Sequence, residues 1–353
     1  MTEIKLGLQA AQDGMKLSRA IHDKDGKVIV PEETCLNSNI ISYLKNVDTQ
    51  YIWVDLIVDD EDSVYMNSIK ERDEFKKFCT AHSQVTDKIK NLLDKIVFSN
   101  LKINEEELIT HMSPLLKITD NPILMLEFLH CMRIHDDSTY DHSVNVGLIC
   151  NIIGKWLNFN KEDRKILTLC GLLHDIGKLK IPKEVLNKPG KLTDEEFEII
   201  KKHPEYGHQI IKTQNINIHI KNSILQHHEK CDGKGYPYGK DNIEIDEYAK
   251  IVTIADIFDA MTANRIYRKG LSPIAVIDWF QSEPINKYKA EYLKIFLEQV
   301  ADTYLNKHVL LSNDEEAHVV LINKSNLTKP IVKTKTRLIN LAEEDGLSIK
   351  ELL

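Results

Sequence analysis

The sequence predicts a mainly α-helical chain with a small α/β module at its amino end and a short β-rich extension at its carboxyl end. Three observations support this prediction. Apolar residues recur at helical spacing through residues 121–300, strand-like runs bounded by turn signals lie within residues 1–58, and alternating apolar runs return in residues 301–353. Residues 59–120 are predicted to form a helical linker ahead of the long helical domain.

The composition of the 353 residues is that of an ordinary globular protein, with 42% hydrophobic and 28% charged residues. The formal net charge of -8 disfavours a protein that grips long nucleic acid by neutralising phosphates. No apolar run approaches the roughly 18 residues of a membrane helix, and the first residues lack the apolar core of a secretion signal. The six cysteines form no C-x-x-C pair. We therefore expect reduced thiols, a cytoplasmic location and no membrane partner.

Two strands and one helix are predicted within the amino-terminal module. The run KVIV (27–30) follows a turn signal at Asp23–Gly26 and ends before Pro31, and YIWVD (51–55) is a second strand-like run. Between them, NIISYLKN (39–46) has the spacing of a short helix. No residue of this module carries chemistry that we can name.

The linker contains a long amphipathic helix. Its seam steps by three and four residues and is apolar at every position except one histidine: Phe75, Phe78, His82, Val85, Ile89, Leu92 and Ile96. This is an a/d heptad pattern. The helix either packs on its own domain or pairs with a second copy in a homodimer, and the sequence leaves both possibilities open.

Helix boundaries within the long domain are signalled by capping residues. Asn160 is predicted to cap the helix that follows it, and Thr193 with Glu196 forms a capping box. The helix opened by that box is expected to end at His203, because Pro204 follows. The predicted helical segments are residues 123–132, 144–156, 161–174, 194–203 and 247–263.

Strand patterns return in the carboxyl-terminal extension. The runs KHVLLS (307–312) and AHVVLI (317–322) are predicted to form a hairpin, and PIVKTK (330–335) a third strand. The terminus itself is predicted to be a frayed helix.

Histidines are concentrated in one part of the chain, with nine of the fourteen between His130 and His228. Several lie on apolar helical faces, where a buried imidazole or carboxylate is costly unless it is paired. Five separate segments each deliver such a group, which together predict a buried metal centre. The candidate ligands are His142, His174, Asp175, His203, His227, His228 and Asp256.

The local context of these residues supports their convergence. His174 and Asp175 end an apolar helix, so both polar groups emerge at its buried end. His227 and His228 are adjacent, and both can face one centre only where a helix ends, which the Gly-rich loop after them allows. Asp256 lies among apolar residues in its helix, and a carboxylate there needs a cation.

The ligand types indicate the chemistry. Nitrogen and oxygen ligands without thiolate disfavour a closed structural zinc site and favour iron, manganese or a similar ion. Seven candidates exceed what one catalytic ion takes, so two ions bridged by a carboxylate are expected, an arrangement suited to phosphoester hydrolysis. Lys178, Arg265 and Arg268 are suited to phosphate binding. The two arginines could instead cap the end of a helix.

Two motifs carry a resemblance to a known family. HDIGK (174–178) and HHEKCDGKGYP (227–237) resemble the signature motifs of the HD-GYP family, a branch of the HD-domain metal phosphohydrolases. The segment DIFDAMTANRIYR (256–268) is also similar, and the resemblance covers residues 121–290. It implies an HD-domain helical bundle around a metal centre, and hydrolysis of cyclic di-GMP to linear pGpG or GMP. Some members act on cyclic GMP-AMP.

The resemblance also implies a role for each candidate residue. One divalent ion would be held by His142, His174, Asp175 and Asp256. The other would be held by Asp175, His203, His227 and His228. The implied catalytic residues are His174, Asp175 and Lys178, and the phosphates would be bound by Lys178, Arg265 and Arg268. Gly235, Tyr236 and Pro237 would shape the substrate pocket and meet a GGDEF-type partner.

One departure from the family pattern affects the expected product. Members with three metals carry a glutamate four residues before the first histidine, where this chain has Ser138. We therefore expect two metals, a bridging hydroxide as nucleophile, and linear pGpG as the main product. Two other readings remain open: a hydrolase of another nucleotide, such as cyclic GMP-AMP, and a protein that senses a nucleotide or metal without turnover.

Overall fold

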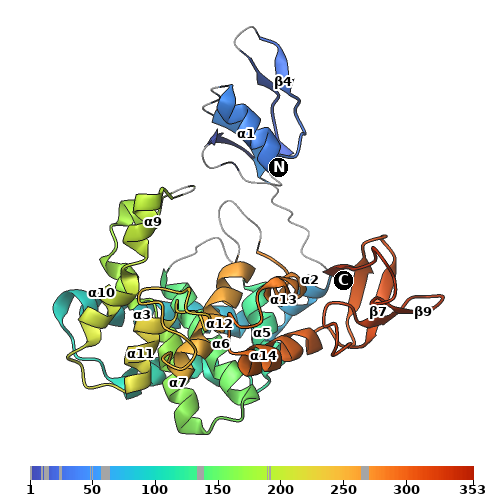
Figure 1. The fold of residues 1–353 in the computed structure, drawn as a ribbon. Helices are drawn as coiled ribbons and strands as arrows, with labels where there is room; N and C mark the ends of the chain where they lie inside the picture. The colour runs from blue at the N-terminus through green and yellow to red at the C-terminus, as the bar shows by residue number, and fades with distance from the viewer. Residues whose placement is uncertain are drawn as a thin grey trace. The chain divides into compact units, whose positions relative to one another are not determined.

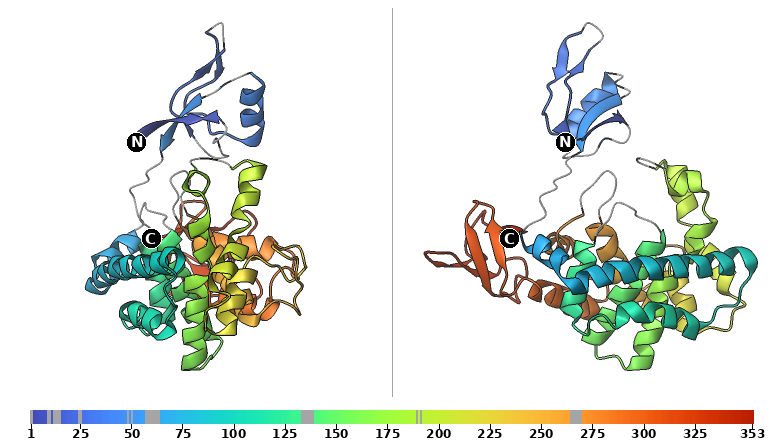
Figure 2. Two further views of the ribbon diagram at one scale, coloured as in Figure 1. Left: turned by 90° about the vertical axis from the view of Figure 1, so that its left-hand side faces the viewer. Right: turned by 180° about the vertical axis from the view of Figure 1, so that it is seen from behind.

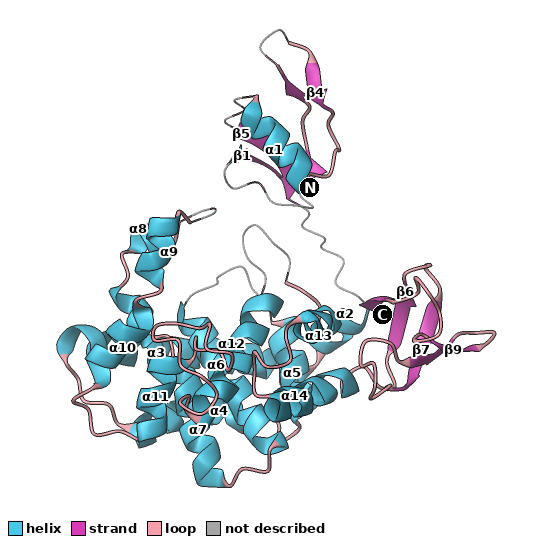
Figure 3. Cartoon of the chain, in the orientation of Figure 1, coloured by secondary structure: helices cyan, strands magenta, loops and turns pink. Residues whose placement is uncertain are grey.

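The computed structural model describes residues 2–8, 11, 16–23, 26–47, 49, 51–56, 64–132, 139–188, 190, 192–263 and 270–353. Its contacts divide the chain into two compact units (Figure 1). One consists of Met1–Asp62 and Pro182–Ile200, and the other of Ser63–Ile181 and Lys201–Leu353. The predicted fold class is confirmed: the chain is mainly helical, with strands near both ends of the sequence (Figure 3).

The first unit contains the predicted α/β elements. Its elements are β1 (Thr2–Gly7), β2 (Lys16–Leu17), β3 (Ile21–His22), β4 (Val28–Val30), α1 (Ser38–Asn46), β5 (Tyr51–Leu56), α8 (Lys183–Leu186) and α9 (Asp194–Ile200). The strand β5 lies between β1 and β2 and is antiparallel to both, while β3 and β4 pair separately. The capping box of α9 forms as predicted: Thr193 Oγ1 accepts from the Glu196 amide, and the Glu196 carboxylate accepts from the Thr193 amide.

The second unit is a helical body followed by a β-sheet. Its helices are α2 (Val64–Glu71), α3 (Asp73–Ser99), α4 (Glu105–Leu116), α5 (Pro122–Cys131), α6 (Thr139–Trp156), α7 (Lys161–Leu173), α10 (His203–Ile211), α11 (Ile218–Gln226), α12 (Glu247–Thr262), α13 (Pro273–Ser282) and α14 (Ala290–Asp302). A 3₁₀ segment, Ile176–Lys180, follows α7. None of the described helices combines the length and apolar character that crossing a bilayer requires.

The helices α6, α7, α11 and α12 pack on one another and form the centre of this body. Apolar side chains explain their packing, because α6 and α7 each carry an almost continuous set of buried residues. Asn160 caps α7 as predicted, its side chain accepting from the Asp163 amide. The capped start and apolar length of α7 hold its carboxyl end, with His174, inside the body.

The long helix α3 lies across the other helices of the second unit, as the right-hand view of Figure 2 shows. Its predicted seam is buried within the chain, where Phe75 and Phe78 pack against Phe128 of α5. One position differs: Leu93 is buried where the heptad predicted Leu92. A straight helix of 3.6 residues per turn drifts away from a strict 3.5-residue repeat, which accounts for the shift.

The carboxyl-terminal residues form an antiparallel sheet of strand order β10-β6-β7-β8-β9. The strands are β6 (His308–Leu311), β7 (Glu316–Leu321), β8 (Ile331–Lys333), β9 (Leu338–Asn340) and β10 (Ile349–Leu352). The predicted hairpin and third strand are present. The prediction of a frayed terminal helix is wrong, because β10 pairs with β6. Its sequence gave no strand signal of its own, and its partner lies far away along the chain.

Candidate metal centre

The predicted ligands come together inside the second unit. They arrive from five places: His142 from the first turn of α6, His174 and Asp175 from the end of α7, His203 from the start of α10, His227 and His228 from the end of α11, and Asp256 from α12. All lie within the body, and four of them (His174, Asp175, His203 and His227) have no exposed surface.

Two groups of these residues have the geometry of a metal site. One is Asp175, His203, His227 and His228, and the other is His142, His174 and Asp175. Within each group, the potential ligand atoms all lie within 4.8 Å of one another. Asp175 belongs to both groups, so its carboxylate lies between them.

The two oxygens of Asp175 face different groups. Its Oδ1 lies 3.2 Å from His203 Nε2 and 3.6 Å from His227 Nε2. Its Oδ2 lies 3.2 Å from His174 Nε2 and 3.5 Å from His142 Nε2. This is the arrangement expected of a carboxylate shared by two ions.

Asp256 closes the site from α12. Its Oδ1 lies 3.1 Å from His142 Nε2 and 3.8 Å from His174 Nε2. Its Oδ2 lies 4.0 Å from His228 Nδ1. The structure therefore places Asp256 beside the His142 group, with its second oxygen toward His228.

Three of the imidazoles are oriented by hydrogen bonds at their outer nitrogen. The Nδ1 atoms of His174, His227 and His142 donate to Gly171 O (2.7 Å), Ser223 O (3.0 Å) and Asp259 Oδ2 (2.7 Å), respectively. Each ring consequently turns Nε2 toward the centre. Such outer hydrogen bonds fix the tautomer and ring orientation of metal-binding histidines.

Several central atoms have no other hydrogen-bonding role. Within the described part of the chain, His174 Nε2 and both carboxylate oxygens of Asp175 are buried and make no hydrogen bond of acceptable geometry. Burying an ionised carboxylate is costly unless cations neutralise it, and Lys178 Nζ, 2.5 Å from Oδ2, supplies only one, on one side. Divalent ions would satisfy these atoms, and the imidazole and carboxylate donors suit iron or manganese. The residues present thus fit a metal centre.

The protonation states of most of these groups also suit metal binding. Burial opposes ionisation of Asp175, but the charges of His174 and Lys178 hold its pKa well below the usual value. Burial also opposes ionisation of Asp256, but the hydrogen bond to His142 and the charges of the surrounding histidines together lower its pKa well below the usual value. Burial lowers the pKa of His227 to about 4 and that of His228 well below its usual value. Ionised carboxylates and neutral imidazoles are the forms that bind metals.

His142 differs from the other histidines. Burial alone would lower its pKa, but hydrogen bonds to Asp256 and Asp259 raise the pKa to about 10. In the absence of a cation, this ring carries the positive charge that the buried acids require. A bound cation would replace that proton, which is the usual exchange when metals bind histidine.

A close backbone approach brings Asp175 and His203 together. A Cβ atom on Gly177 would lie 1.9 Å from the carbonyl oxygen of His203, so only glycine allows this contact. His203 is the first residue of α10, which corrects the prediction that it ends the preceding helix. Proline is favoured in the first helical turn, so Pro204 begins a helix here.

The loop of Gly235, Tyr236 and Pro237, called the GYP loop below, packs over the group that contains His228. The ring of Tyr236 stacks on His228, with centroids 4.6 Å apart, and Lys201 Nζ lies 5.6 Å from the centroid of Tyr236. A Cβ on Gly235 would lie 2.4 Å from the Cα of Glu229, so glycine permits the loop to fold back on the histidine pair. Pro237 follows Tyr236 in this loop.

Two acids near the site were missed by sequence reasoning. Asp259 accepts from His142, and buried Glu229 accepts from the backbone amides of Tyr238 and Lys240. Asp259 could have been noticed because it lies three residues after Asp256, on the same face of α12. Glu229 directly follows the histidine pair but gives no comparable sequence signal.

Of the three predicted basic residues, the structure describes one. Lys178 Nζ lies 2.5 Å from Asp175 Oδ2, at the edge of the centre, and its side chain is partly exposed. Arg265 and Arg268 lie outside the described residues, as does Ser138, on which the expected number of metals depends.

Part of the chain matches the model of a known protein family. Residues 128–291 match the family model described as "HD domain". A solved structure of an HDG"Y"P protein from Bdellovibrio bacteriovorus is similar in fold, with a TM-score of 0.51 and 17% identity. That similarity covers 85% of this chain and 99% of the other.

Three curated proteins illustrate the similarity in sequence. A cyclic di-GMP phosphodiesterase of Pseudomonas aeruginosa is 37% identical over 140 residues, covering 39% of this chain and 34% of the relative. A 3'3'-cGAMP-specific phosphodiesterase of Vibrio cholerae is 39% identical over 148 residues, covering 41% and 34%. A cyclic di-GMP phosphodiesterase of Thermotoga maritima is 34% identical over 186 residues, covering 51% and 50%. The matches span half or less of each relative's length.

Proposed function

Residues 128–291 form an HD domain that carries both HD-GYP motifs, and from this we propose that the protein is a metal-dependent cyclic-dinucleotide phosphodiesterase. The proposed reaction is hydrolysis of a 3',5'-phosphodiester of cyclic di-GMP to linear pGpG. The observation that carries the proposal is the position of Asp175, whose two oxygens face two separate groups of histidines.

The proposed cofactors are two divalent ions, iron or manganese. The first would be held by His142, His174, Asp175 and Asp256. The second would be held by Asp175, His203, His227 and His228. When bound, such a pair of ions lowers the pKa of a shared water and neutralises the charge that develops on the phosphodiester.

The chain's own residues supply orientation and charge. Asp259 and the carbonyl oxygens of Gly171 and Ser223 hold the imidazoles in position. Lys178, at the edge of the centre, is proposed to bind a phosphate oxygen of the substrate, as are Arg265 and Arg268. Tyr236 is proposed to shape the pocket, because its ring covers one side of His228.

Two metals, rather than three, follow from Ser138 at the position of the additional glutamate. The proposed product is accordingly pGpG, with slow further cleavage to GMP. The GYP loop is also proposed to meet a GGDEF-type partner, supported by Tyr238, whose exposed fraction is 57%. A cytoplasmic location is part of the same proposal.

The relatives named for cyclic GMP-AMP support a second candidate substrate. The full chain, purified without oxygen, should be assayed with cyclic di-GMP and with cyclic GMP-AMP in the presence of iron or manganese. Chromatography of the products and elemental analysis of the protein complete the experiment. We expect pGpG and two metals per chain, and no turnover by the His174→Ala/Asp175→Ala variant.

Three results would contradict parts of this proposal. Mostly GMP with three metals per chain would refute the two-metal assignment. Faster turnover of cyclic GMP-AMP would reassign the substrate. Tight nucleotide binding without turnover under either metal would indicate a sensor rather than an enzyme.

A further inference from the structure

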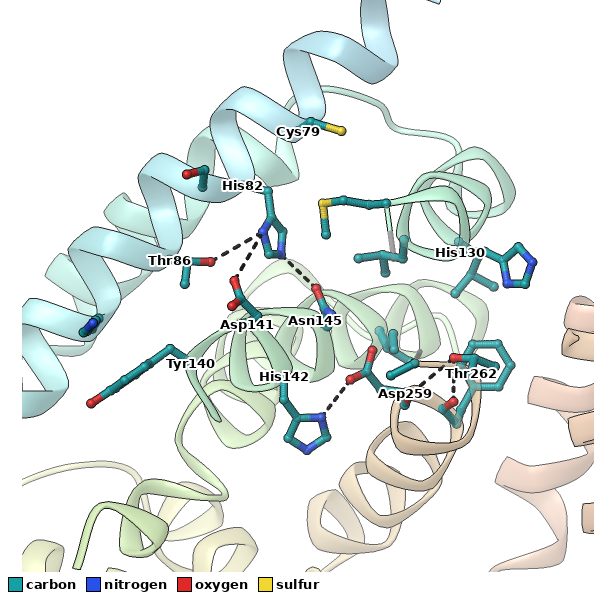
Figure 4. A pocket seen from close by; sticks show the side chains of 18 of the residues that line it. Cys79, His82, Thr86, His130, Tyr140, Asp141, His142, Asn145, Asp259 and Thr262 are labelled. Atoms are coloured by element: carbon teal, nitrogen blue, oxygen red, sulfur yellow. Dashed lines mark hydrogen bonds and ion pairs between the residues drawn. The ribbon is translucent and has the colours of Figure 1, made fainter. Parts of the chain in front are cut away.

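The way in which its ring is held distinguishes His228 from three other candidate ligands. The rings of His174 and His227 donate to backbone carbonyls, and the ring of His142 donates to Asp259, as Figure 4 shows. Within the described part of the chain, neither ring nitrogen of His228 makes a hydrogen bond. A different kind of contact must therefore orient this ring.

That contact is made by the ring of Tyr236. The two rings stack, with centroids 4.6 Å apart and planes inclined by 25°. His228 also contacts the rings of His203 and His227, but these belong to the same group of ligands. Tyr236 comes from outside the group, so it can do for His228 what an outer hydrogen bond does for the other ligands.

His228 is also the ligand of its group that solvent reaches. Its side chain is 21% exposed, whereas the side chains of Asp175, His203 and His227 have no exposed surface. A partly exposed side chain has fewer neighbours than a buried one, so its orientation depends more on each of them. The stack with Tyr236 therefore acts where the group is least enclosed.

The position of Tyr236 depends in turn on Glu229. This acid directly follows His228 and is only 2% exposed. Its Oε1 accepts from the amide of Tyr238 at 2.7 Å, and its Oε2 accepts from the amide of Lys240 at 3.0 Å. Such charge-assisted bonds satisfy a buried carboxylate. The chain that follows Tyr236 is thereby fixed to the residue that follows His228.

The loop is fixed at Tyr236 itself as well. The amide of Tyr236 donates to the carbonyl oxygen of His228 at 3.2 Å. A Cβ atom on Gly235 would lie 2.4 Å from the Cα of Glu229, so the loop lies directly against the chain at the histidine pair. The carboxylate of Glu229 supplies two of the hydrogen bonds that keep the loop in this position.

We propose that Glu229 is a positioning residue of the metal centre: it holds Tyr236 on the ring of His228, and the stacked ring keeps His228 in place as a ligand. Glu229 itself acts on neither the ion nor the substrate directly. The inference rests on the metal centre of the proposed function, but it does not depend on which nucleotide is hydrolysed.

The test compares metal binding by four forms of the full chain: wild type, Glu229→Gln, Tyr236→Ala and the double variant. Bound ions are removed with a chelator, and Mn²⁺ is then titrated in competition with a fluorescent chelator of known affinity, without nucleotide. Glutamine keeps one acceptor oxygen but turns a donor toward the second amide, so it weakens the hold on the loop without emptying the site.

Two further variants serve as matched controls. Tyr236→Phe removes the hydroxyl and keeps the ring that stacks on His228. Glu244→Gln alters another acid that accepts from a backbone amide, that of Asp241, a few residues further along the chain. Both controls should bind Mn²⁺ as wild type does.

We expect wild type to bind two ions, and Glu229→Gln to bind one of them about 10- to 100-fold more weakly, the usual effect of losing an outer partner of a ligand. Affinity for the other ion should change less. Tyr236→Ala should show a similar loss, and adding Glu229→Gln to it should cause no further loss, because both changes act on one contact. A purely structural effect would weaken binding of both ions and would add in the double variant.

The outcomes separate this inference from the proposed function. Two ions bound equally well by wild type and Tyr236→Ala overturn the inference, even if Glu229→Gln fails to fold, and leave the function standing. Additive losses in the double variant overturn the route from Glu229 through Tyr236. Weaker binding by the variants, without turnover of cyclic di-GMP by wild type, supports the inference and overturns the function. No Mn²⁺ bound by wild type overturns both.

Discussion

The Nε2 atoms of His203 and His227 lie 3.1 Å apart in a fully buried site. His227 donates from Nδ1 to the carbonyl oxygen of Ser223, so its Nε2 carries a lone pair directed toward His203. Two imidazole nitrogens at this separation require a proton or a cation beside them. The pair therefore links ion binding to the stability of the fold.

Removal of metal should destabilise the protein. Ions at about 100 times their Kd stabilise a protein by about 2.7 kcal/mol, which corresponds to roughly 5–10 °C in the Tm of a domain of this size. We expect a fall of that order with a chelator, and recovery with Mn²⁺, in a thermal melt. The His203→Ala/His227→Ala variant is the control, and its Tm should respond much less. Equal melting of wild type with and without chelator would contradict the link.

Asp175→Asn should disturb both groups of ligands at once. The amide removes the charge from the one carboxylate that both groups share. Losing an outer hydrogen-bond partner of a metal ligand lowers metal affinity by up to about 100-fold. Because Asp175 is itself a shared ligand in this proposal, we expect the metal affinity to fall by at least that factor. Elemental analysis and phosphodiesterase assays measure the change. Asp302→Asn, which removes a surface partner of Lys324, is the control. Full metal content in Asp175→Asn would show that the carboxylate is not shared.

Asp259→Ala tests a residue that holds His142 rather than the ions. Losing the 2.7 Å hydrogen bond frees the imidazole to rotate and to change tautomer. Metal affinity or activity should fall by about 10–100-fold. A competition titration against a chelator of known affinity measures the metal affinity. The Asp259→Asn variant keeps an acceptor and should retain more affinity than Asp259→Ala, an order that a purely structural role would not produce.

Gly177→Ala should destabilise the protein, because the added Cβ would meet the carbonyl oxygen of His203. Overpacking of this kind typically costs about 1–3 kcal/mol in the free energy of unfolding, which urea denaturation can measure. Gly154→Ala is the control, since its Cβ would meet the Arg164 and Leu167 side chains at 3.0 and 3.3 Å rather than a backbone carbonyl. Helix propensity favours alanine at that helical position. Similar stability of the two variants would mean that the 3₁₀ segment moves away easily.

Much of the fold could be predicted because its signals are local. Asn160, Thr193 and Glu196 act through neighbouring backbone amides, and the structure contains those caps. The strand β10 could not be predicted in this way, since it depends on pairing with β6 about forty residues earlier.

The candidate ligands were found because a histidine or an acid on an apolar face needs a partner. That rule identifies the residues but does not predict which of them lie next to one another. Which oxygen of Asp175 faces which group depends on how the end of α7 meets α10, a contact that Gly177 permits. Asp259 was missed because its role depends on its hydrogen-bond partner, His142, which lies on another helix more than a hundred residues earlier.

A polar contact ties the long helix α3 to α6. Its 27 residues span about 40 Å, and an α-helix is stiff along its axis. Asp73 and His82 lie on this one helix, and His82 Nε2 is 2.8 Å from Asn145 Oδ1 on α6, so the hydrogen bond between these two atoms holds α3 against α6. The position of α3 on α6 therefore depends on a polar contact that involves none of the candidate metal ligands.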